Sequence, residues 1–439
     1  MESRSPETPK VRRLEVLFAL AFALALVAVG AAAAALPPYG NNGRVLTALP
    51  GAEARAAGIA SYGGGRAIVA GTVSTAGDGD FVLARYRPDG RLDPSFGQGG
   101  IVRTDLGAAE TATDVKIDSF GQVLVSGYSD PDPSPGKVRD QEAIVARYRP
   151  DGSLDPSFGA GGIVRAGRGL ALAVVADRAD HVLVAGVAVG DAGGSWRVAR
   201  FDHDGSVDTG FGGGDGEVTG APTASGASAS DLTVDPGGRV VLAVCGEEEE
   251  TAPVLTAYRL LADGSLDPSF GAGGRVKVRL AETWACAQAI SRDQRGRIVV
   301  AGNGNRRMVA ARLRADGSRD RSFAGDGTVS LFFAGQDVRF GRIAVDGRNR
   351  VAMAGGIAPQ APRARYPARM LLAKLRADGR RDRRFAGDGV LAVRFGPDKT
   401  FDSRAADATI FQGALYAAGT AAPHRPSSSP ARIALFRYP

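Results

Sequence analysis

The three histidines are the side chains with the widest catalytic and metal-binding chemistry, and they are His181, His203 and His424. The repeat pattern described below predicts His181 and His203 in turns at one end of the strands, in different repeats, and His424 in a loop at the other end. A Ser–His–Asp triad or a histidine-ligated metal needs its groups within hydrogen-bond or ligand distance. We therefore predict no catalytic residue and no metal site among them.

The acidic stretch with Asp202, Asp204, Gly205 and Asp208 is similar to a calcium-binding loop. Calcium takes roughly 6–8 oxygen ligands, and its loops end on a bidentate acid that this stretch lacks. The glycines fall at repeat turns rather than between a strand and a helix, which disfavours a nucleotide site. We predict no metal and no cofactor. Hydrolysis by a pair of carboxylates stays an alternative, because it needs only two acids that converge in space.

Cys245 and Cys286 are the only cysteines. The predicted strands put Cys245 just after the second strand of one repeat and Cys286 at the start of the first strand of the next. A disulfide, which suits an exported protein, and two buried free thiols fit this placement about equally.

The formal charge of +7 is unevenly distributed, because residues 301–385 hold 19 Lys and Arg against 7 Asp. Such an arc would attract a polyanion. No aromatic residues alternate with the basic ones, as the stacking of bases would require. We favour solvated surface arginines and predict no nucleic-acid partner.

All of these residues are set in a chain that repeats one phrase at intervals of 53–62 residues. Its clearest copies read PDGRLDPSFGQGGIV at 88–102 and PDGSLDPSFGAGGIV at 150–164. A period of this size indicates one supersecondary unit stacked on copies of itself. One phenylalanine marks each of the six copies: Phe96, Phe158, Phe211, Phe270, Phe323 and Phe385.

The second copy shows how a repeat is built. Residues 114–118 and 122–127 alternate around a tight turn and predict a hairpin, 143–148 a third strand and 163–165 a fourth. The hairpin recurs seven times. The sequence therefore predicts an all-β, seven-bladed β-propeller with four antiparallel strands per blade.

The two ends of this pattern complement each other. Residues 39–45 read as the start of a fourth strand, and residues 434–438 as a third strand without a successor. We expect the N-terminal strand to be the outer strand of the last blade and to close the ring, so that no strand edge is left exposed.

The phrase itself predicts a local structure. Asp155 as N-cap and Pro156 at the first helical position predict a single helical turn that swings Phe158 inward. We expect the six marker phenylalanines to be structural plugs between neighbouring blades. The recurrent third-strand arginine, Arg147 here, and the recurrent aspartate are predicted ion-pair or capping partners.

LDPSFGxGG together with DGxVLVAG and VARYxxDG resembles the delta-60 repeat, a β-propeller repeat of bacterial exported and surface proteins. The resemblance extends over residues 39–438. It implies a propeller and often an envelope or extracellular location, and it implies no settled activity, cofactor or catalytic residue. Three copies depart from the motif, with Thr209-Gly210, Arg321-Ser322 and Arg383-Arg384 in place of Pro-Ser.

Residues 1–36 have the composition of a signal peptide. Lys10, Arg12 and Arg13 precede an apolar run at 16–29, and small residues follow at 31–35. An uncleaved membrane anchor is the alternative, because the apolar stretch approaches the ~20 residues that span a bilayer. We expect residues 37–439 to form a single propeller domain, secreted or held in the cell envelope.

Function is expected where the repeats differ, which is in the loops between second and third strands. We predict a monomeric, non-catalytic scaffold that binds a protein or a glycan through these loops. The alternative is a hydrolase or lyase that uses carboxylates and arginines near the central channel. The candidate binding residues are Asp130, Asp132, Lys137, Arg363, Arg365, Tyr366, His424 and Arg425.

Overall fold

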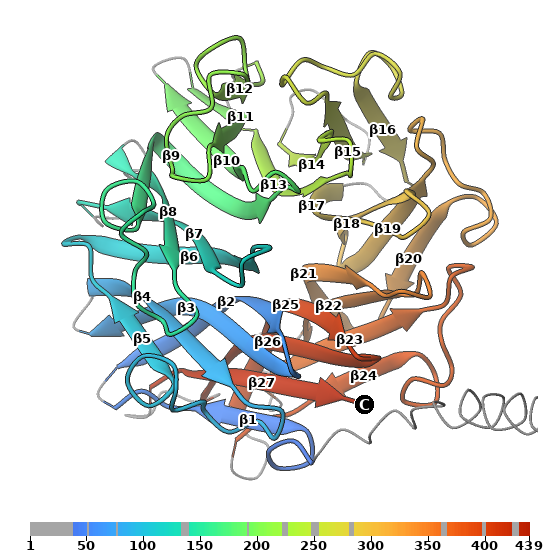
Figure 1. Cartoon of the computed structure of the whole chain (residues 1–439). Helices are drawn as coiled ribbons and strands as arrows, with labels where there is room; N and C mark the ends of the chain where they lie inside the picture. Colours follow the sequence, from blue (N-terminus) through green and yellow to red (C-terminus); the bar gives the residue numbers. More distant parts are fainter. Residues whose placement is uncertain are drawn as a thin grey trace, which may run out of the picture. The chain divides into compact units, whose positions relative to one another are not determined.

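In the computed structural model, the described residues form 27 β-strands, and no α-helix is among their elements (Figure 1). This confirms the predicted all-β fold class for these residues. Among the same residues, no helical segment has the length and apolar character that crossing a membrane requires. The structure describes residues 38–50, 52–75, 78–132, 140–190, 193–221, 227–246, 254–280, 285–360, 367–396, 401–423 and 430–439.

The strands form six hydrogen-bonded sheets, and five of them have four antiparallel strands, as predicted for one repeat. The first of the five pairs strands from both ends of the described chain, and the other four follow the chain order. In spatial order they are β1 (Arg44–Thr47), β27 (Arg432–Tyr438), β26 (Ala414–Pro423) and β25 (Phe401–Phe411); β2 (Glu53–Tyr62), β3 (Arg66–Thr75), β4 (Asp78–Tyr86) and β5 (Ile101–Thr104); β13 (Ser228–Val234), β14 (Val240–Cys245), β15 (Val254–Leu260) and β16 (Arg275–Arg279); β17 (Ala285–Arg292), β18 (Ile298–Gly304), β19 (Arg307–Leu313) and β20 (Thr328–Phe332); β21 (Gln336–Val345), β22 (Val351–Pro359), β23 (Arg369–Leu375) and β24 (Val390–Val393).

The sixth sheet has seven strands, which differs from the expected separate sheets. Its strand β9 runs unbroken for 14 residues and pairs with β8 through its first part and with β10 through its second. One strand therefore serves as the last strand of one repeat and the first strand of the next. The sheet consists of β6 (Ala109–Ile117), β7 (Val123–Asp130), β8 (Glu142–Tyr148), β9 (Ile163–Ala176), β10 (Val182–Gly190), β11 (Gly193–Phe201) and β12 (Glu217–Thr219).

The first strands of successive repeats lie next to one another around a common centre (Figure 1). Strand β2 contacts β6 and β25, and the chain of neighbours continues through β9, β13, β17 and β21. Five hydrophobic clusters of the described residues lie between neighbouring sheets, and one lies within the seven-stranded sheet, between the strands on either side of β9. Each of the six marker phenylalanines belongs to a different one of these clusters.

Strands β1 and β27 join the two ends of the described chain, as the sequence predicts. They pair antiparallel from Arg44 opposite Phe436 to Thr47 opposite Ile433. Because β1 has no other partner strand, it is the edge of its sheet.

The antiparallel order gives every sheet two distinct ends. We call one the turn end, because the hairpin turns between first and second strands and the Asp-Gly turns after third strands lie there. The opposite loop end holds the connections between second and third strands. In the second repeat, residues 118–122 and 149–153 belong to the turn end and residues 131–132 and 140–141 to the loop end.

Candidate functional site

Five charged side chains meet at the centre of the molecule, on the first strands of their repeats. We call Asp114, Lys116, Asp231, Arg342 and Asp407 the central cluster. All but Asp114 line a cavity of 380 Å³, to which all seven first strands contribute. The three aspartates are buried, with exposed fractions of 1, 7 and 5%.

β-Bulges place these side chains. The register of β6 against β7 shifts between Ala112 and Asp114, and the same shift precedes Asp231 in β13 and Asp407 in β25. In β21 the register shifts between Phe340 and Ile343, so the irregular segment includes Arg342. A bulge inserts one residue and redirects the side chain that follows it. The bulge is thus the device that turns a strand residue toward the centre.

Glycines on the second strands make room for the bulges. A Cβ atom on Gly127 of β7 would lie 2.2 Å from the carbonyl oxygen of Thr111 in β6. The glycine of the VLVSG and VLVAG segments is therefore explained by close approach of the two backbones rather than by a ligand.

Each central aspartate joins two neighbouring first strands. Asp407 of β25 accepts hydrogen bonds from the backbone N–H of Ala408 at 2.7 Å and of Ile59 in β2 at 2.9 Å. Asp231 does the same with Leu232 and with Ile290 of β17, and Asp114 with Val115 and Val174 of β9. Both carboxylate oxygens of every central aspartate are therefore used within the fold.

The two cations of the cluster pair with these carboxylates. The Lys116 Nζ lies 2.7 and 2.8 Å from the two carboxylate oxygens of Asp114. The Arg342 guanidinium lies 2.5 Å from Asp231 Oδ1 and 3.9 Å from Asp114 Oδ2, and it donates to the carbonyl of Leu172. Asp407 is the member whose nearest interactions are backbone amides.

The electrostatics follow from this unequal pairing. Burial raises the pKa of Asp114, but the charges of Lys116 and Arg342 outweigh it, and the pKa lies below its ordinary value. Burial raises the pKa of Asp407, and the more remote cations do not compensate. Burial lowers the pKa of Lys116, but the carboxylates of Asp114 and Asp407 outweigh it and hold the pKa above its ordinary value. Two carboxyls whose pKa values shift in opposite directions are typical of a catalytic acid–base pair. Here, however, both carboxyls accept hydrogen bonds from backbone amides.

The sequence prediction did not include the central cluster. Its signal was present as an aspartate in otherwise small or apolar first strands, at Thr113-Asp114-Val115, Ser230-Asp231-Leu232 and Ala406-Asp407-Ala408. A charged residue at a position that other repeats fill with small residues is informative, because a buried charge needs a partner.

The structure describes only two of the binding residues predicted for the loop end. Asp130 ends β7, and its carboxylate accepts hydrogen bonds from the Asp132 backbone N–H and the Gln141 side chain. Both aspartates lie at the loop end, as expected. The other candidates lie outside the described residues: Lys137, Arg363, Arg365, Tyr366, His424 and Arg425.

The marker phenylalanines and the recurrent arginines form one repeated contact, which we call the junction. In the second copy, Arg147 Nε lies 2.8 Å from Asp155 Oδ2, Nη2 donates to the Ser157 hydroxyl, and the guanidinium stacks 4.5 Å from the Phe158 ring centroid. Its Nη1 donates to the carbonyl of His203 in the next repeat. The same Arg–Asp–Phe set recurs as Arg85–Asp93–Phe96, Arg200–Asp208–Phe211, Arg259–Asp267–Phe270 and Arg312–Asp320–Phe323.

The predicted cap at Asp155 and the inward position of Phe158 are confirmed, but the prediction of a helical turn is wrong. The segment is a hydrogen-bonded turn, in which Phe158 N–H donates to the Asp155 carbonyl at 3.1 Å and Ser157 N–H to its carboxylate at 3.2 Å. The aspartate caps a turn that the following glycines reverse, so no helix forms. Burial raises the pKa of Asp155, but the bonds from Ser157 and the charge of Arg147 outweigh it and hold the pKa below its ordinary value.

Cys245 of β14 and Cys286 of β17 form a disulfide in the structure, with a Cα–Cα distance of 5.0 Å. The bond links the second strand of one repeat to the first strand of the next. Of the two alternatives that the sequence allows, the structure holds the disulfide.

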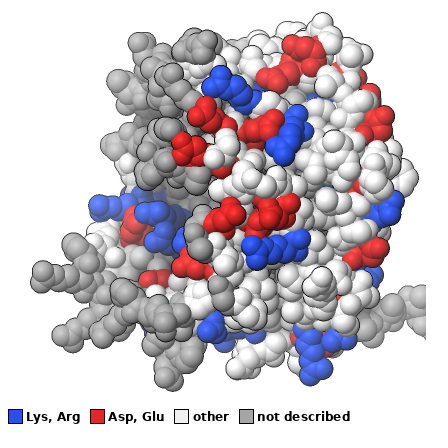
Figure 2. Space-filling view, turned by 90° about the vertical axis from the view of Figure 1, so that its left-hand side faces the viewer, with Lys and Arg blue, Asp and Glu red and all other residues white. Residues whose placement is uncertain are grey.

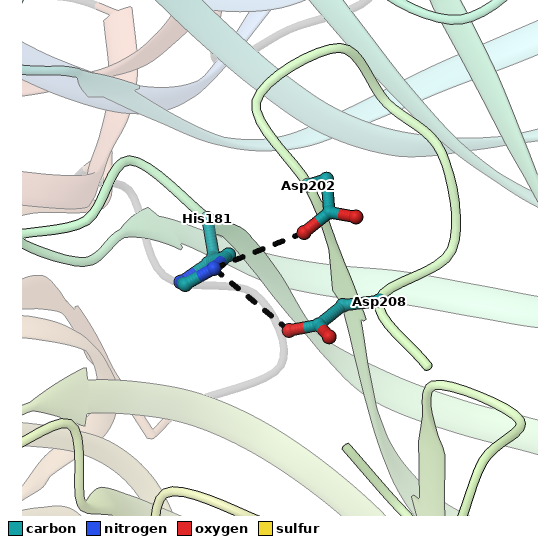
Figure 3. Close-up of side chains that lie close together, drawn as sticks. All are labelled: His181, Asp202 and Asp208. Atoms are coloured by element: carbon teal, nitrogen blue, oxygen red, sulfur yellow. Dashed lines mark ion pairs between the residues drawn. The ribbon is translucent and has the colours of Figure 1, made fainter. Parts of the chain in front are cut away.

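His181 and His203 flank neighbouring strands β10 and β11 of one sheet, which corrects their expected separation into different repeats. His181 Nε2 lies 3.8 Å from Asp202 Oδ1 and 3.9 Å from Asp208 Oδ2 (Figure 3), and its Nδ1 lies 2.9 Å from Asp177. The side chains of His181, Asp202 and Asp208 could together hold a metal ion. However, Asp208 already pairs with the Arg200 guanidinium, whose positive charge opposes a cation.

A comparison with another repeat explains the His181 group. Arg297 holds the position of His181 in the hairpin of the fifth copy, and its guanidinium pairs with Asp293 at 2.7 Å and with Asp320 at 3.2 Å. His181 meets the equivalent carboxylates, Asp177 and Asp208. We therefore assign the group to the junction and not to a metal.

The model of a family described as "Domain of unknown function (DUF5122) beta-propeller" matches this chain at residues 65–96, 140–158, 180–211, 238–270 and 296–323. The matches support a β-propeller family. Each of them ends at or near a marker phenylalanine, so the family pattern and the junction coincide.

Solved structures are similar to the chain in fold only. A protein of unknown function from Dyadobacter fermentans is 12% identical, with 91% of this chain and 99% of that chain covered and a TM-score of 0.43. YCF48 from Cyanidioschyzon merolae is 9% identical, with 90% and 98% covered and a TM-score of 0.42. The polysaccharide lyase Uly1 is 9% identical, with 92% and 90% covered and a TM-score of 0.48. No curated protein matches the chain.

Proposed function

We propose that this protein is an exported, non-catalytic β-propeller scaffold that binds a protein or a glycan through its loop end. The observation that carries the proposal is the use of the central aspartates. Their oxygens accept hydrogen bonds from backbone N–H groups of two neighbouring strands each, so these buried carboxyls hold the fold together instead of facing a substrate. Function is then left to the surface segments in which the repeats differ.

We infer seven blades of the delta-60 kind for this scaffold. Seven first strands line one central cavity, and the seven-stranded sheet divides into two blades at the point where β9 changes its partner. The pairing of β1 with β27 supports closure of the ring by the N-terminal strand. The stability of the whole ring would then depend on residues 39–47.

Export rests on two features. Residues 1–36, which lie outside the described residues, have the composition of a signal peptide. The Cys245–Cys286 disulfide suits the oxidising conditions outside the cytoplasm. We propose a secreted or envelope location, with a membrane attachment only if the N-terminal segment is retained, and a monomeric state.

The test is direct binding by the exported chain, screened against a glycan array and against fractionated envelope proteins of the producing cell. A ligand of the loop end should bind at least about tenfold more weakly to the double variant Asp130→Ala, Asp132→Ala. The matched control is Asp151→Ala, Asp204→Ala, which removes two exposed acids at the turn end. Equal affinities of the two double variants for every ligand found would contradict the proposal.

A second function, a hydrolase or lyase of the central cavity, is favoured by one observation. Asp407 has a raised pKa and shares the 380 Å³ cavity with Lys116 and Arg342. Incubation of the chain with bound glycans separates the two functions. Bond cleavage that disappears in Asp407→Ala but persists in Asp231→Ala would support the enzyme function and contradict the non-catalytic scaffold.

A further inference from the structure

The sixth copy of the junction departs from the other five. Lys374 stands where the third strand otherwise carries arginine, and Arg384 stands at the position of Ser322 in the fifth copy. The fork of hydrogen bonds that Arg312 makes to Asp320, Ser322 and the next repeat therefore has no counterpart here.

Asp382, the aspartate of this junction, consequently forms only a weak ion pair. Asp382 Oδ2 lies 3.8 Å from Arg350 Nη1, and no other cation of the described residues lies within 4.0 Å of it. The Lys374 ammonium lies 5.9 Å from the Phe385 centroid, and burial and the neighbouring Arg350 lower its pKa.

A hollow of 1070 Å³ opens at this place on the turn end, and we call it the arginine groove. Seven arginines and two aspartates line it, and no aromatic residue is among its lining residues. Five of the arginines come from the sixth phrase and the turn beside it: Arg348, Arg380, Arg381, Arg383 and Arg384.

These five arginines are exposed. Arg376 and Arg350, which also line the groove, pair with Asp378 at 2.7 Å and with Asp346 at 2.6 Å. Within the described residues, no carboxylate lies within 4.0 Å of the guanidinium groups of the five. Their charges therefore add up over one hollow, which concentrates the positive potential there.

The groove differs from other parts of the surface. On the side shown in Figure 2, basic and acidic side chains are interspersed, so their fields largely cancel. In the junctions of the other copies, the arginine is buried against its aspartate, as Arg147 is against Asp155. The sixth copy lacks the buried, neutralised Arg–Asp pair and carries a cluster of exposed positive charge instead.

From this geometry we propose that the arginine groove is a binding site for an acidic polysaccharide. Planar guanidinium groups donate paired hydrogen bonds to carboxylate and sulfate groups. A row of them in an open hollow matches a linear polymer with a regularly spaced negative charge. A single-stranded nucleic acid fits less well, because base stacking needs aromatic side chains and the lining has none. The site lies at the turn end, opposite the loop end, and does not depend on the function proposed for the loop end.

The experiment measures binding of the full exported chain to heparin oligosaccharides and to polygalacturonate by calorimetry at 0.15 M salt, with neutral dextran as reference. We expect binding to both acidic glycans and none to dextran. The variant Arg380→Glu, Arg384→Glu should lower the affinity at least about tenfold, because two attractions become repulsions. Binding should also weaken with added salt.

The matched control is Arg87→Glu, Arg91→Glu, which changes the net charge equally at the turn end of the first copy, with Arg91 at the position of Arg380. It should retain the parent affinity. Equal losses in both variants would show attraction by net charge alone and overturn the site. Absence of binding to either acidic glycan, or tighter binding of a single-stranded DNA oligonucleotide, would overturn it as well. Melting temperatures of both variants within about 3 °C of the parent would show that the fold is intact.

Discussion

The fifth and sixth junctions have the same backbone and different chemistry. In both, an aspartate caps the turn, a phenylalanine is buried, and the glycine after the turn donates its N–H to that phenylalanine's carbonyl at 2.8 Å. In the fifth, Arg312 is 1% exposed and bonds to Asp320, Ser322 and the carbonyl of Ala377. In the sixth, Lys374 replaces this arginine, and five exposed arginines line the arginine groove beside it.

The comparison shows which residues of the phrase are required for folding. The aspartate and the phenylalanine are present in both junctions, so they set the turn and fill the core. The arginine fork can be omitted, which means that it adds stability without defining the fold. In the sixth copy, Arg384 at the position of the serine lines the arginine groove.

The contact between the first and last repeats extends the comparison. Tyr39 takes the place of the phenylalanine, with the Arg437 guanidinium 4.7 Å from its ring centroid. Arg437 Nη1 donates to the Pro88 carbonyl at 2.9 Å, as the other arginines do to the next repeat, and Gly40 N–H donates to the Asp89 carbonyl. This junction is assembled from residues almost 400 positions apart in the chain.

The largest effect is expected from removal of residues 39–47. The deletion takes away Tyr39 and strand β1, and it leaves β27 as an exposed edge. The free energy of unfolding should fall by more than the about 3–5 kcal/mol that one buried aromatic contributes. Chemical denaturation measures the loss, and removal of residues 1–36 alone is the control. An unchanged unfolding curve would show that the two ends do not stabilise each other.

Phe158→Ala should cost about 3–5 kcal/mol, because the side chain is fully buried between the two halves of the seven-stranded sheet and its removal leaves a cavity. Phe120→Ala is the matched control, since that ring is 62% exposed and should change stability by less than about 0.5 kcal/mol. Both values come from urea unfolding. A cost of less than about 1 kcal/mol for Phe158→Ala would refute the role of the marker phenylalanine as a plug between neighbouring repeats.

The smallest effect, and the sharpest test of the comparison, is an exchange of cations. Arg312→Lys should cost about 2–3 kcal/mol, because a lysine cannot reach Asp320, Ser322 and the Ala377 carbonyl together. Lys374→Arg should change stability by less than about 1 kcal/mol, or raise it, since Asp382 gains a partner. Equal destabilisation by the two exchanges would mean that the sixth junction has adapted to lysine and is not simply missing its fork.

The central cluster shows where prediction from sequence stops. The strands that carry Asp114, Asp231 and Asp407 were predictable from alternation and turn residues. Their convergence was not, because it depends on bulges that redirect single side chains and on contacts between strands of different repeats. The predicted helical turn at Asp155 failed for a related reason, since Asp-Pro suits the start of a helix and a capped turn alike.

The sequence by itself determined the all-β class, the repeat and the residues that every repeat shares, because periodic hydrophobicity and turn residues act over short distances along the chain. Only the tertiary structure decided which buried charges meet, whether the two cysteines pair and where unpaired arginines gather. Those outcomes depend on residues from different repeats that come within a few ångströms of one another only after the sheets pack.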